Sequence, residues 1–530
     1  MTNTQRSKLW WRHTFICLML IVFGGCQGSA ERAEMHYNQA VEYLTAKDYE
    51  SAVIALKNAV QADPDHAEAR YRLGLVHLQL GDRNEAFRHL NAAVGLEPEN
   101  REAQMILADM LFDGGEYEKC RAKVEYVLAV KPDTAGALAL LARVEAMKWR
   151  YDEALAAIDK ALALEKANDR FRVVRARILT AAGKTDKAEQ EFKEALEINP
   201  LRIENHLALA DFYRRQEKQK LAEQQIDRMV SVLSDSPKAY LIRADFYEKS
   251  EKYGKALASL KKAVQMTPED DANLVLLADF HRRRKEYERA DSVYAKAIKL
   301  STAPAAIIAR QADMAFASGR YKLARSKVTE ALGRDSGNPD ALIVEAKLKV
   351  RDKDYRAAFE LTDRALRRNP NAGVAYYVKA RAYQDMLETG MALSAAGLAV
   401  RYSPEHVASR VLLAELYLRK RAVVEARLEA ERALALEPDN LKAASILGSC
   451  LFAQKEYEKS LEQFAKIREK RPGDAAAAEV TGLIYATMEK YDKAAEAFEK
   501  ALDYTPWSYS LMHNLIMVYL EQGQTGPCRL

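Results

Sequence analysis

The sequence contains few cysteines and carries no strong net charge. Its 530 residues include five cysteines, which are too scattered for a disulfide framework or a cysteine metal site. The formal net charge is +5 at pH 7 and falls to +2 without the three cations of residues 1–25. Because nucleic acid binding depends on many cations facing phosphates, this near balance argues against nucleic acid as the main partner.

The sequence also lacks a motif for catalysis or cofactor binding. Gly183–Thr185 resembles the end of a phosphate-binding loop, but the first glycine of such a loop is missing and no strand is expected before it. The nine histidines are dispersed. His206, His281 and His406 share no metal-ligand spacing, and we interpret each as a surface or groove-lining residue. The sequence therefore predicts no catalytic residue, no cofactor and no metal ligand.

What the sequence does contain is a repeat of 34 residues. Steps of 34 from residue 64 to residue 506 meet proline at ten of fourteen positions, without a shift of one residue in register. These prolines are Pro64, Pro98, Pro132, Pro200, Pro268, Pro370, Pro404, Pro438, Pro472 and Pro506. A fixed period of this size indicates one small supersecondary unit copied many times.

Small residues recur at three positions of a frame that begins at Ala33 and gives fourteen full units up to Ser508. The eighth position is alanine or glycine in every unit, as in Ala40, Gly74 and Ala108. The twentieth is alanine in twelve units and the twenty-seventh in eleven. This pattern predicts two helices packed so closely that larger side chains would clash, at a cost of about 1–3 kcal/mol per site.

The residues between these positions predict two helices per unit. Ala67–Leu80 has apolar residues at spacings of three and four, and Glu85–Leu96 follows as a second helix. Asp65 with Glu68 predicts a capping box at the start of the first helix. Thirteen of the fourteen prolines are expected in loops between units, because proline disfavours helical geometry in the residue before it.

These features resemble the tetratricopeptide repeat family. The resemblance covers residues 33–508 and includes tyrosine at position seventeen, as in Tyr49 and Tyr117, and proline at position thirty-two. It implies an all-α solenoid of about fourteen helix-turn-helix repeats in a right-handed superhelix, whose first helices line a concave groove. Such arrays bind other proteins and act as scaffolds.

Residues 509–530 are predicted to form a partial fifteenth repeat and a tail. Tyr509–Glu521 matches the first helix of a repeat, and no second helix follows it. Its run Leu515–Leu520 is strongly apolar, although arrays usually end in a polar capping helix. Two interpretations stay open: this face docks on a partner, or the chain is a truncated version of a longer array.

The first residues differ in kind from the repeats. A basic start precedes the apolar run Phe15–Phe23, which is far shorter than the roughly 20 residues of a spanning helix, so residues 1–25 are predicted to be a signal peptide. The small residues before Cys26 resemble the bacterial lipobox, which implies lipidation of Cys26 and a short tether over residues 26–32. Gln27 points by resemblance to the outer membrane. Cleavage without lipid is the alternative.

By resemblance to the family, positions two, five, nine and twelve of each first helix face the groove. Position nine is charged in the ten middle units. The groove-binding candidates at this position are Asp109, Arg143, Arg177, Asp211, Asp245, Asp279, Asp313, Lys347 and Arg381. Four consecutive aspartates predict an acidic ladder that suits an extended charged ligand. Alternatively, pairs such as Asp211 with Arg214 and Arg215, or Asp245 with Lys249, only stabilise their own helices.

The sequence as a whole predicts a lipid-anchored scaffold on the periplasmic side of the outer membrane. It would join the proteins of an envelope complex for secretion, pilus assembly or exopolysaccharide export, and it resembles the repeat lipoproteins of PEP-CTERM/exosortase-associated exopolysaccharide systems. The basic run Arg282–Lys285 suits either the C-terminal end of a helix or an acidic polysaccharide. A periplasmic chaperone or pilotin, and a non-catalytic subunit that activates an enzyme, are the alternatives.

Overall fold

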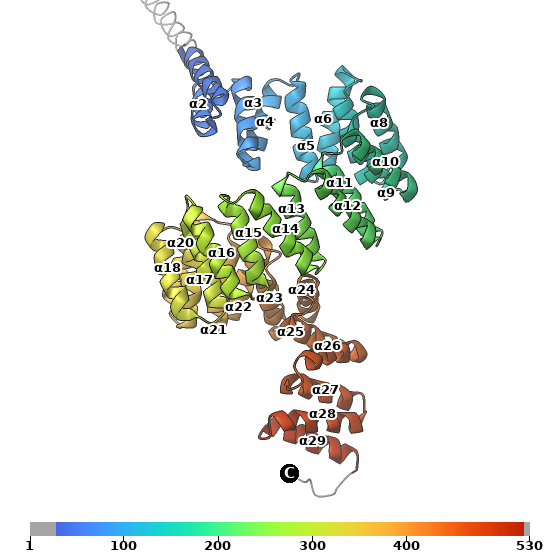
Figure 1. Ribbon diagram of the computed structural model, residues 1–530, viewed down its shortest axis with the longest axis vertical. Helices are drawn as coiled ribbons and strands as arrows, with labels where there is room; N and C mark the ends of the chain where they lie inside the picture. The colour runs from blue at the N-terminus through green and yellow to red at the C-terminus, as the bar shows by residue number, and fades with distance from the viewer. Residues whose placement is uncertain (1–27, 524–530) are drawn as a thin grey trace, which may run out of the picture. The chain divides into compact units, whose positions relative to one another are not determined.

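The computed structural model describes residues 28–523, and their regular structure is entirely helical (Figure 1). Consecutive helices pair through short turns, which confirms the predicted all-α, helix-turn-helix solenoid. The predicted signal peptide, Cys26 and residues 524–530 of the tail lie outside the described residues. Every helix of the described part is too short or too polar to span a bilayer.

The first helices of the repeats occupy positions one to thirteen of the frame, with one extra leading residue in α17. Residues 28–45 are also helical. The first helices are α3 (Ala67–Gln79), α5 (Arg101–Asp113), α7 (Ala135–Met147), α9 (Asp169–Ala181), α11 (Ile203–Arg215), α13 (Pro237–Lys249), α15 (Asp271–Arg283), α17 (Pro304–Ala317), α19 (Pro339–Arg351), α21 (Gly373–Asp385), α23 (Val407–Arg419), α25 (Leu441–Ala453), α27 (Ala475–Thr487) and α29 (Tyr509–Glu521).

The second helices occupy positions seventeen to thirty without exception. They are α2 (Tyr49–Ala62), α4 (Arg83–Leu96), α6 (Tyr117–Val130), α8 (Tyr151–Leu164), α10 (Thr185–Ile198), α12 (Gln219–Val232), α14 (Tyr253–Met266), α16 (Tyr287–Leu300), α18 (Tyr321–Arg334), α20 (Tyr355–Arg368), α22 (Thr389–Tyr402), α24 (Val423–Leu436), α26 (Tyr457–Lys470) and α28 (Tyr491–Tyr504).

Three local expectations were wrong. The second helix of the second repeat begins at Arg83, two residues before Glu85, because Asp82 caps it through a hydrogen bond from the backbone N–H of Glu85. His66, not Asp65, caps α3, since the chain enters the helix at position thirty-four of the frame. Three prolines, Pro237, Pro304 and Pro339, are the first residues of their helices, where the missing N–H costs nothing.

The turn after every first helix has the same left-handed backbone. Position fifteen has a positive φ, between 57° and 80°, in all fifteen frames, although only five of these residues are glycine. The next N–H then closes the helix end, as from Asp82 to the carbonyl of His77 at 2.8 Å. The conformation of the turn is therefore the same in every repeat, whichever residue stands at position fifteen. A residue with a side chain, such as the exposed Leu387, adopts this conformation at some cost in backbone strain.

The small residues mark the closest approach of the two helices within a repeat. Ala40 and Ala108 are fully buried. A Cβ at Gly74 would lie 2.6 Å from Leu90 Cγ, and one at Gly448 would lie 2.7 Å from Phe464 Cε2. Position eight thus faces position twenty-four of the second helix, and the glycines there leave no room for a side chain.

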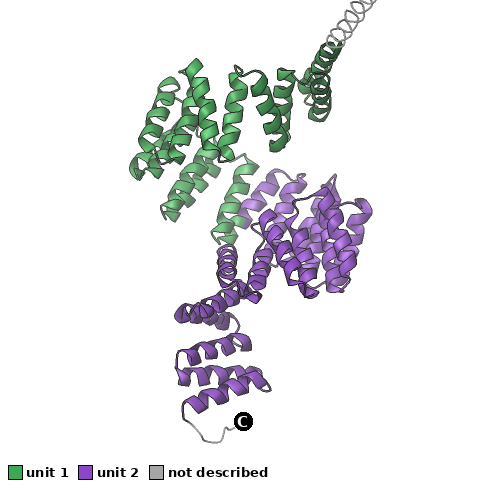
Figure 2. Cartoon of the chain, turned by 180° about the vertical axis from the view of Figure 1, so that it is seen from behind, with its two compact units in different colours: residues 1–256 green, residues 257–530 purple. Residues whose placement is uncertain are grey.

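The chain divides into two compact units, and the boundary between them lies within α14 (Figure 2). The first unit ends at Ala256 and the second begins at Leu257. Each unit has its own apolar core. In the first unit Leu107 and Val124 are fully buried in one cluster, and in the second Leu342 and Val378 are buried in another. The core of each unit is built by neighbouring repeats, because a single repeat cannot bury its apolar face alone.

We expect Gly448→Leu to destabilise the second unit by about 1–3 kcal/mol, because the new side chain must displace the ring of Phe464. Gly397→Leu in α22 is the matched control. A Cβ there meets no heavy atom within 4 Å, so replacing a helical glycine should stabilise by up to about 1 kcal/mol. Urea unfolding followed by circular dichroism measures both. Shifts of the same sign would show that helix approach does not limit this position.

Candidate functional site

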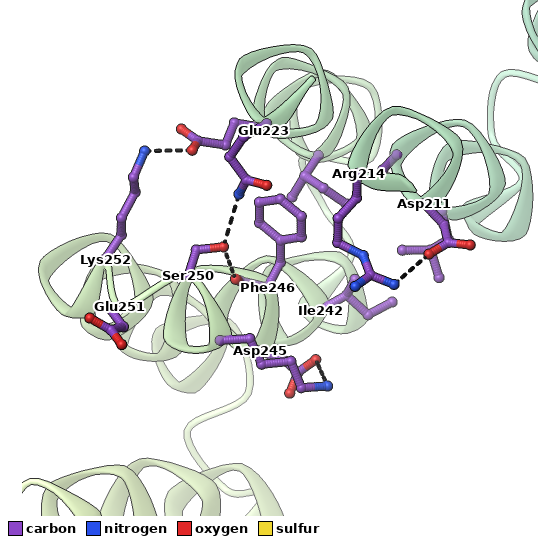
Figure 3. Close-up of a pocket in the computed structure, with 14 residues that line it drawn as sticks. Asp211, Arg214, Glu223, Ile242, Asp245, Phe246, Ser250, Glu251 and Lys252 are labelled. Atoms are coloured by element: carbon purple, nitrogen blue, oxygen red, sulfur yellow. Dashed lines mark hydrogen bonds and ion pairs between the residues drawn. The ribbon is translucent and has the colours of Figure 1, made fainter. Parts of the chain in front are cut away.

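The first unit contains a cavity of about 770 Å³ between repeats six and seven (Figure 3). It is lined by α11, α12, α13 and the turn Ser250–Lys252. Its apolar part includes Leu207, Ile242 and Phe246, while the charged side chains of both repeats surround it. A cavity with an apolar floor and a few fixed charges suits a peptide side chain or a short extended segment.

Two of the candidate aspartates line this cavity. Asp211 accepts hydrogen bonds from Arg214 and Arg215, both at 2.7 Å. Burial raises the pKa of Asp211, but these two hydrogen bonds outweigh it and hold the pKa below its ordinary value. Asp245 pairs with Lys249 at 2.9 Å, and the two side chains are 64% and 76% exposed. Such an exposed pair contributes little to stability, so both groups stay available to a ligand.

The second unit contains a smaller cavity of about 210 Å³. Seven of its nine lining residues stand at positions two, five, nine and twelve of their repeats, the positions that the family resemblance assigns to the groove. These seven are Arg282, Ala309, Asp313, Asp340, Ile343, Lys347 and Val374. In the first unit, positions five, nine and twelve of repeat six line the larger cavity in the same way.

Asp279 differs from the other candidate aspartates because it is buried. One carboxylate oxygen accepts hydrogen bonds from the Tyr294 hydroxyl at 2.5 Å and from Arg282 Nε at 3.2 Å, and the other accepts from Arg310 at 2.5 Å. The side chain is only 8% exposed. Tyr294 occupies position twenty-four of the second helix, so its hydroxyl meets Asp279 within the repeat. This aspartate therefore belongs to a structural network and not to an exposed acidic ladder.

Candidate residues of neighbouring repeats also pair with each other. Arg143 donates to Asp109 at 2.8 Å, and Lys347 donates to Asp313 at 2.6 Å; each pair is 34 residues apart. Burial raises the pKa of Asp313, but Lys347 outweighs it and lowers the pKa. Opposite charges at one frame position in consecutive repeats were the sequence signal for these pairs. Arg177 is exposed.

Arg381 and Asp340 complete the charged surface of the second unit. Arg381 donates a hydrogen bond of 2.9 Å to the side-chain oxygen of Gln384. The amide nitrogen of Gln384 in turn donates to Glu415. Asp340, at position two of α19, was not among the candidates. Asp340 is exposed to solvent, and partial desolvation by the surrounding protein raises its pKa above the ordinary value.

The interpretation of His206 and His281 as surface or groove-lining residues was wrong. His206 is buried, with its ring nitrogens 2.8 Å from the carbonyl of Pro200 and 2.6 Å from the Gln225 amide. His281 is buried too, with Nδ1 2.6 Å from Glu286. Their polar atoms have partners inside the fold, which is why burial is tolerated.

Comparisons with family models also identify the repeats. Models of the tetratricopeptide repeat match residues 148–200, 237–270, 274–305 and 377–440. The chain carries tetratricopeptide repeats. A model of subunit 3 of the anaphase-promoting complex (cyclosome) matches residues 45–126 and 425–501. No curated protein matches the chain. Tetratricopeptide repeats suggest a protein–protein interaction scaffold.

Solved structures of tetratricopeptide repeat proteins resemble parts of the chain. YrrB, described as having an unusual peptide-binding site, is 26% identical over 35% of this chain and 96% of its own, with a TM-score of 0.32. A repeat protein from Parabacteroides merdae is 21% identical over 47% and 98%, with a TM-score of 0.38. The Cut9–Hcn1 hetero-tetramer of the APC/C is 13% identical over 82% and 99%, with a TM-score of 0.34.

We expect Asp279→Ala to destabilise its repeat by roughly 2–3 kcal/mol. The substitution removes the hydrogen-bond acceptor of Tyr294 and of two arginines, and water can replace that acceptor only in part. Asp245→Ala, at the same frame position, should change stability by less than about 0.5 kcal/mol. Amide hydrogen exchange of α15 and α13, respectively, measures the two effects. Equal losses of protection would contradict the distinction between a structural and a free aspartate.

Proposed function

We propose that this tetratricopeptide repeat chain is a non-catalytic scaffold that holds extended segments of partner proteins along the first helices of its repeats. The observation that carries the proposal is the lining of both cavities. Residues at positions five, nine and twelve contribute apolar and charged side chains to the cavity of each unit, and position two contributes to that of the second unit. A repeated arrangement of this kind can meet successive side chains of one extended ligand.

The charges at these cavities favour a ligand with charges of both signs. Asp245 and Lys249 are exposed and only weakly paired with each other. A ligand cation can replace Lys249 as the partner of Asp245, and a ligand anion can face Lys249, at little cost to the fold. Several such weak contacts, held in register by one segment, add up to useful affinity and specificity. Apolar side chains of the ligand would cover Phe246 and Ile242.

We further propose that the scaffold is anchored in the cell envelope through a lipidated Cys26, on the periplasmic side of the outer membrane. The support is the sequence alone: a basic start, a short apolar run and small residues before the cysteine. Its partners would be proteins of a complex for secretion, pilus assembly or exopolysaccharide export, with an acidic polysaccharide as a further ligand of the basic run Arg282–Lys285. A chaperone or pilotin, or an accessory subunit of an enzyme, would use the same surface.

A photo-crosslinking side chain placed at Asp245 or Asp340 should join the chain to a few discrete partners in cells, because both residues are exposed and line cavities. The matched control is Asp152, an exposed residue of the second helix α8 at position eighteen of its repeat. Mass spectrometry of the products measures partner number. A broad spectrum of products would favour the chaperone, and equal crosslinking from Asp152 would contradict the proposed surface.

Cys26→Ser should abolish labelling with radioactive palmitate and release the chain from the membrane fraction. The acyl chains of a lipidated cysteine contribute ~0.8 kcal/mol per buried methylene, so their loss removes stable anchoring. Cys17→Ser, in the predicted signal peptide, is the control and should leave labelling unchanged. Labelling that persists in Cys26→Ser would show that the anchor lies elsewhere.

A further inference from the structure

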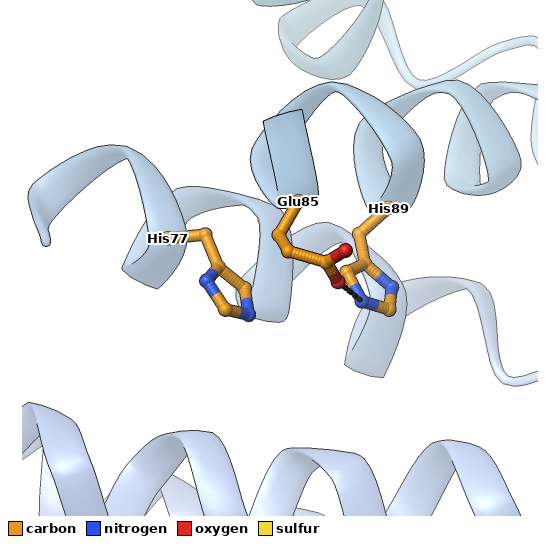
Figure 4. Close-up of side chains that lie close together, drawn as sticks. All are labelled: His77, Glu85 and His89. Carbon is orange, nitrogen blue, oxygen red and sulfur yellow. Dashed lines mark ion pairs between the residues drawn. The ribbon is translucent and has the colours of Figure 1, made fainter. Parts of the chain in front are cut away.

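A cluster of two histidines and a glutamate lies in the second repeat. His77 comes from the last turn of α3, and Glu85 and His89 come from successive turns of α4 (Figure 4). Each residue offers one ligand atom, and these atoms lie within 4.8 Å of one another. Nε2 of His89 is 3.6 Å from the Glu85 carboxylate, and the two imidazole rings stack with centroids 5.8 Å apart.

Both imidazoles are buried and incompletely hydrogen-bonded. His77 is 6% exposed and His89 is 4% exposed. Within the described part of the chain, neither ring nitrogen of His77 has a hydrogen-bond partner, and Nδ1 of His89 has none. Burial lowers the pKa of both imidazoles, that of His89 to about 4. Buried polar atoms in native proteins nearly always have a partner, so the unpartnered nitrogens of His77 point to a missing ligand.

Repeat eight provides an internal comparison, because His281 stands at the same frame position as His77. There the longer Glu286 reaches Nδ1 of His281 at 2.6 Å, whereas Asp82 in repeat two stays 3.7 Å from Nδ1 of His77. Repeat eight has Val293 where repeat two has His89. The orphaned nitrogens and the second imidazole therefore occur together in repeat two, and repeat eight has neither.

We propose that His77, Glu85 and His89 bind a divalent transition-metal ion, for which Zn²⁺ is the appropriate probe. Two imidazoles with one carboxylate are a ligand set that Zn²⁺ favours, whereas Mg²⁺ and Ca²⁺ prefer oxygen ligands throughout. Zn–N bonds of about 2.0–2.1 Å require the three ligand atoms to move closer together by roughly 1 Å. The Glu85 side chain is 36% exposed and can adjust, and it leaves the site reachable from solvent.

Two neighbouring residues would shape this site. Asp82 lies 3.7 Å from Nδ1 of His77, where a carboxylate can orient a metal-bound imidazole or serve as a further ligand. Arg88 contacts the Glu85 carboxylate, and its guanidinium lies 3.1 Å from Nε2 of His89. This cation competes with a metal ion for the same two ligands. Because the Arg88 side chain is 64% exposed, it can swing away into solvent when the ion binds.

The test uses the full chain without a polyhistidine tag, freed of metal with a chelator. Isothermal titration with Zn²⁺ should show one tight site per chain, and Co²⁺ should give the visible absorption of a tetrahedral nitrogen–oxygen site. His89→Gln should weaken Zn²⁺ binding by more than about 100-fold, and Glu85→Gln by about 10–100-fold. Arg88→Ala should tighten it, because the competing cation is gone.

His281→Gln is the matched control and should leave Zn²⁺ affinity unchanged, since its ring already has a partner. Glu85→Gln and Arg88→Ala change side chains that are at least one third exposed, so they test the site even where His89→Gln perturbs the fold. Absence of a stoichiometric Zn²⁺ site in the unaltered chain would overturn the proposal. So would unchanged affinity in both Glu85→Gln and Arg88→Ala, or an equal loss in His281→Gln.

Discussion

Each repeat depends on the close approach of its two helices, where position eight of the first meets position twenty-four of the second. At Gly74 and Gly448 there is no room for a Cβ against Leu90 and Phe464. This contact fixes how each first helix is rotated about its axis. It therefore decides which positions pack inside the repeat and which remain on the open face, and the cavities in both units follow from that rotation.

A single frame position can serve three physical purposes. At position nine, Asp279 is buried in a network with Tyr294, while Asp313 pairs with a cation of the next repeat, and Asp245 is left exposed. The difference comes from what surrounds the carboxylate and not from the carboxylate itself. Desolvation makes the first indispensable to the fold, whereas solvent screening leaves the last free to meet a partner.

The histidines at position eleven, His77 and His281, also differ because of their surroundings. The glutamate of repeat eight reaches its imidazole, but the aspartate of repeat two is one methylene shorter and stays 3.7 Å away. Small differences in side-chain length are therefore enough to leave a buried imidazole without a partner in one repeat and satisfied in another. In a solenoid such differences are tolerated, because each repeat contacts mainly its neighbours and the rest of the array is unaffected.

The helices and their register could be predicted from the sequence, because they depend on local contacts repeated every 34 residues. Even the last described helix, α29, spans the predicted Tyr509–Glu521. Some helix starts and caps, such as those of α4 and α3, differed from the prediction. The partners of the charges and the burial of His206 and Asp279 depended on side chains of other helices, 15 to 34 residues away. Local periodicity specifies the backbone of such an array. Desolvation and pairing of individual polar groups arise only when the repeats stack.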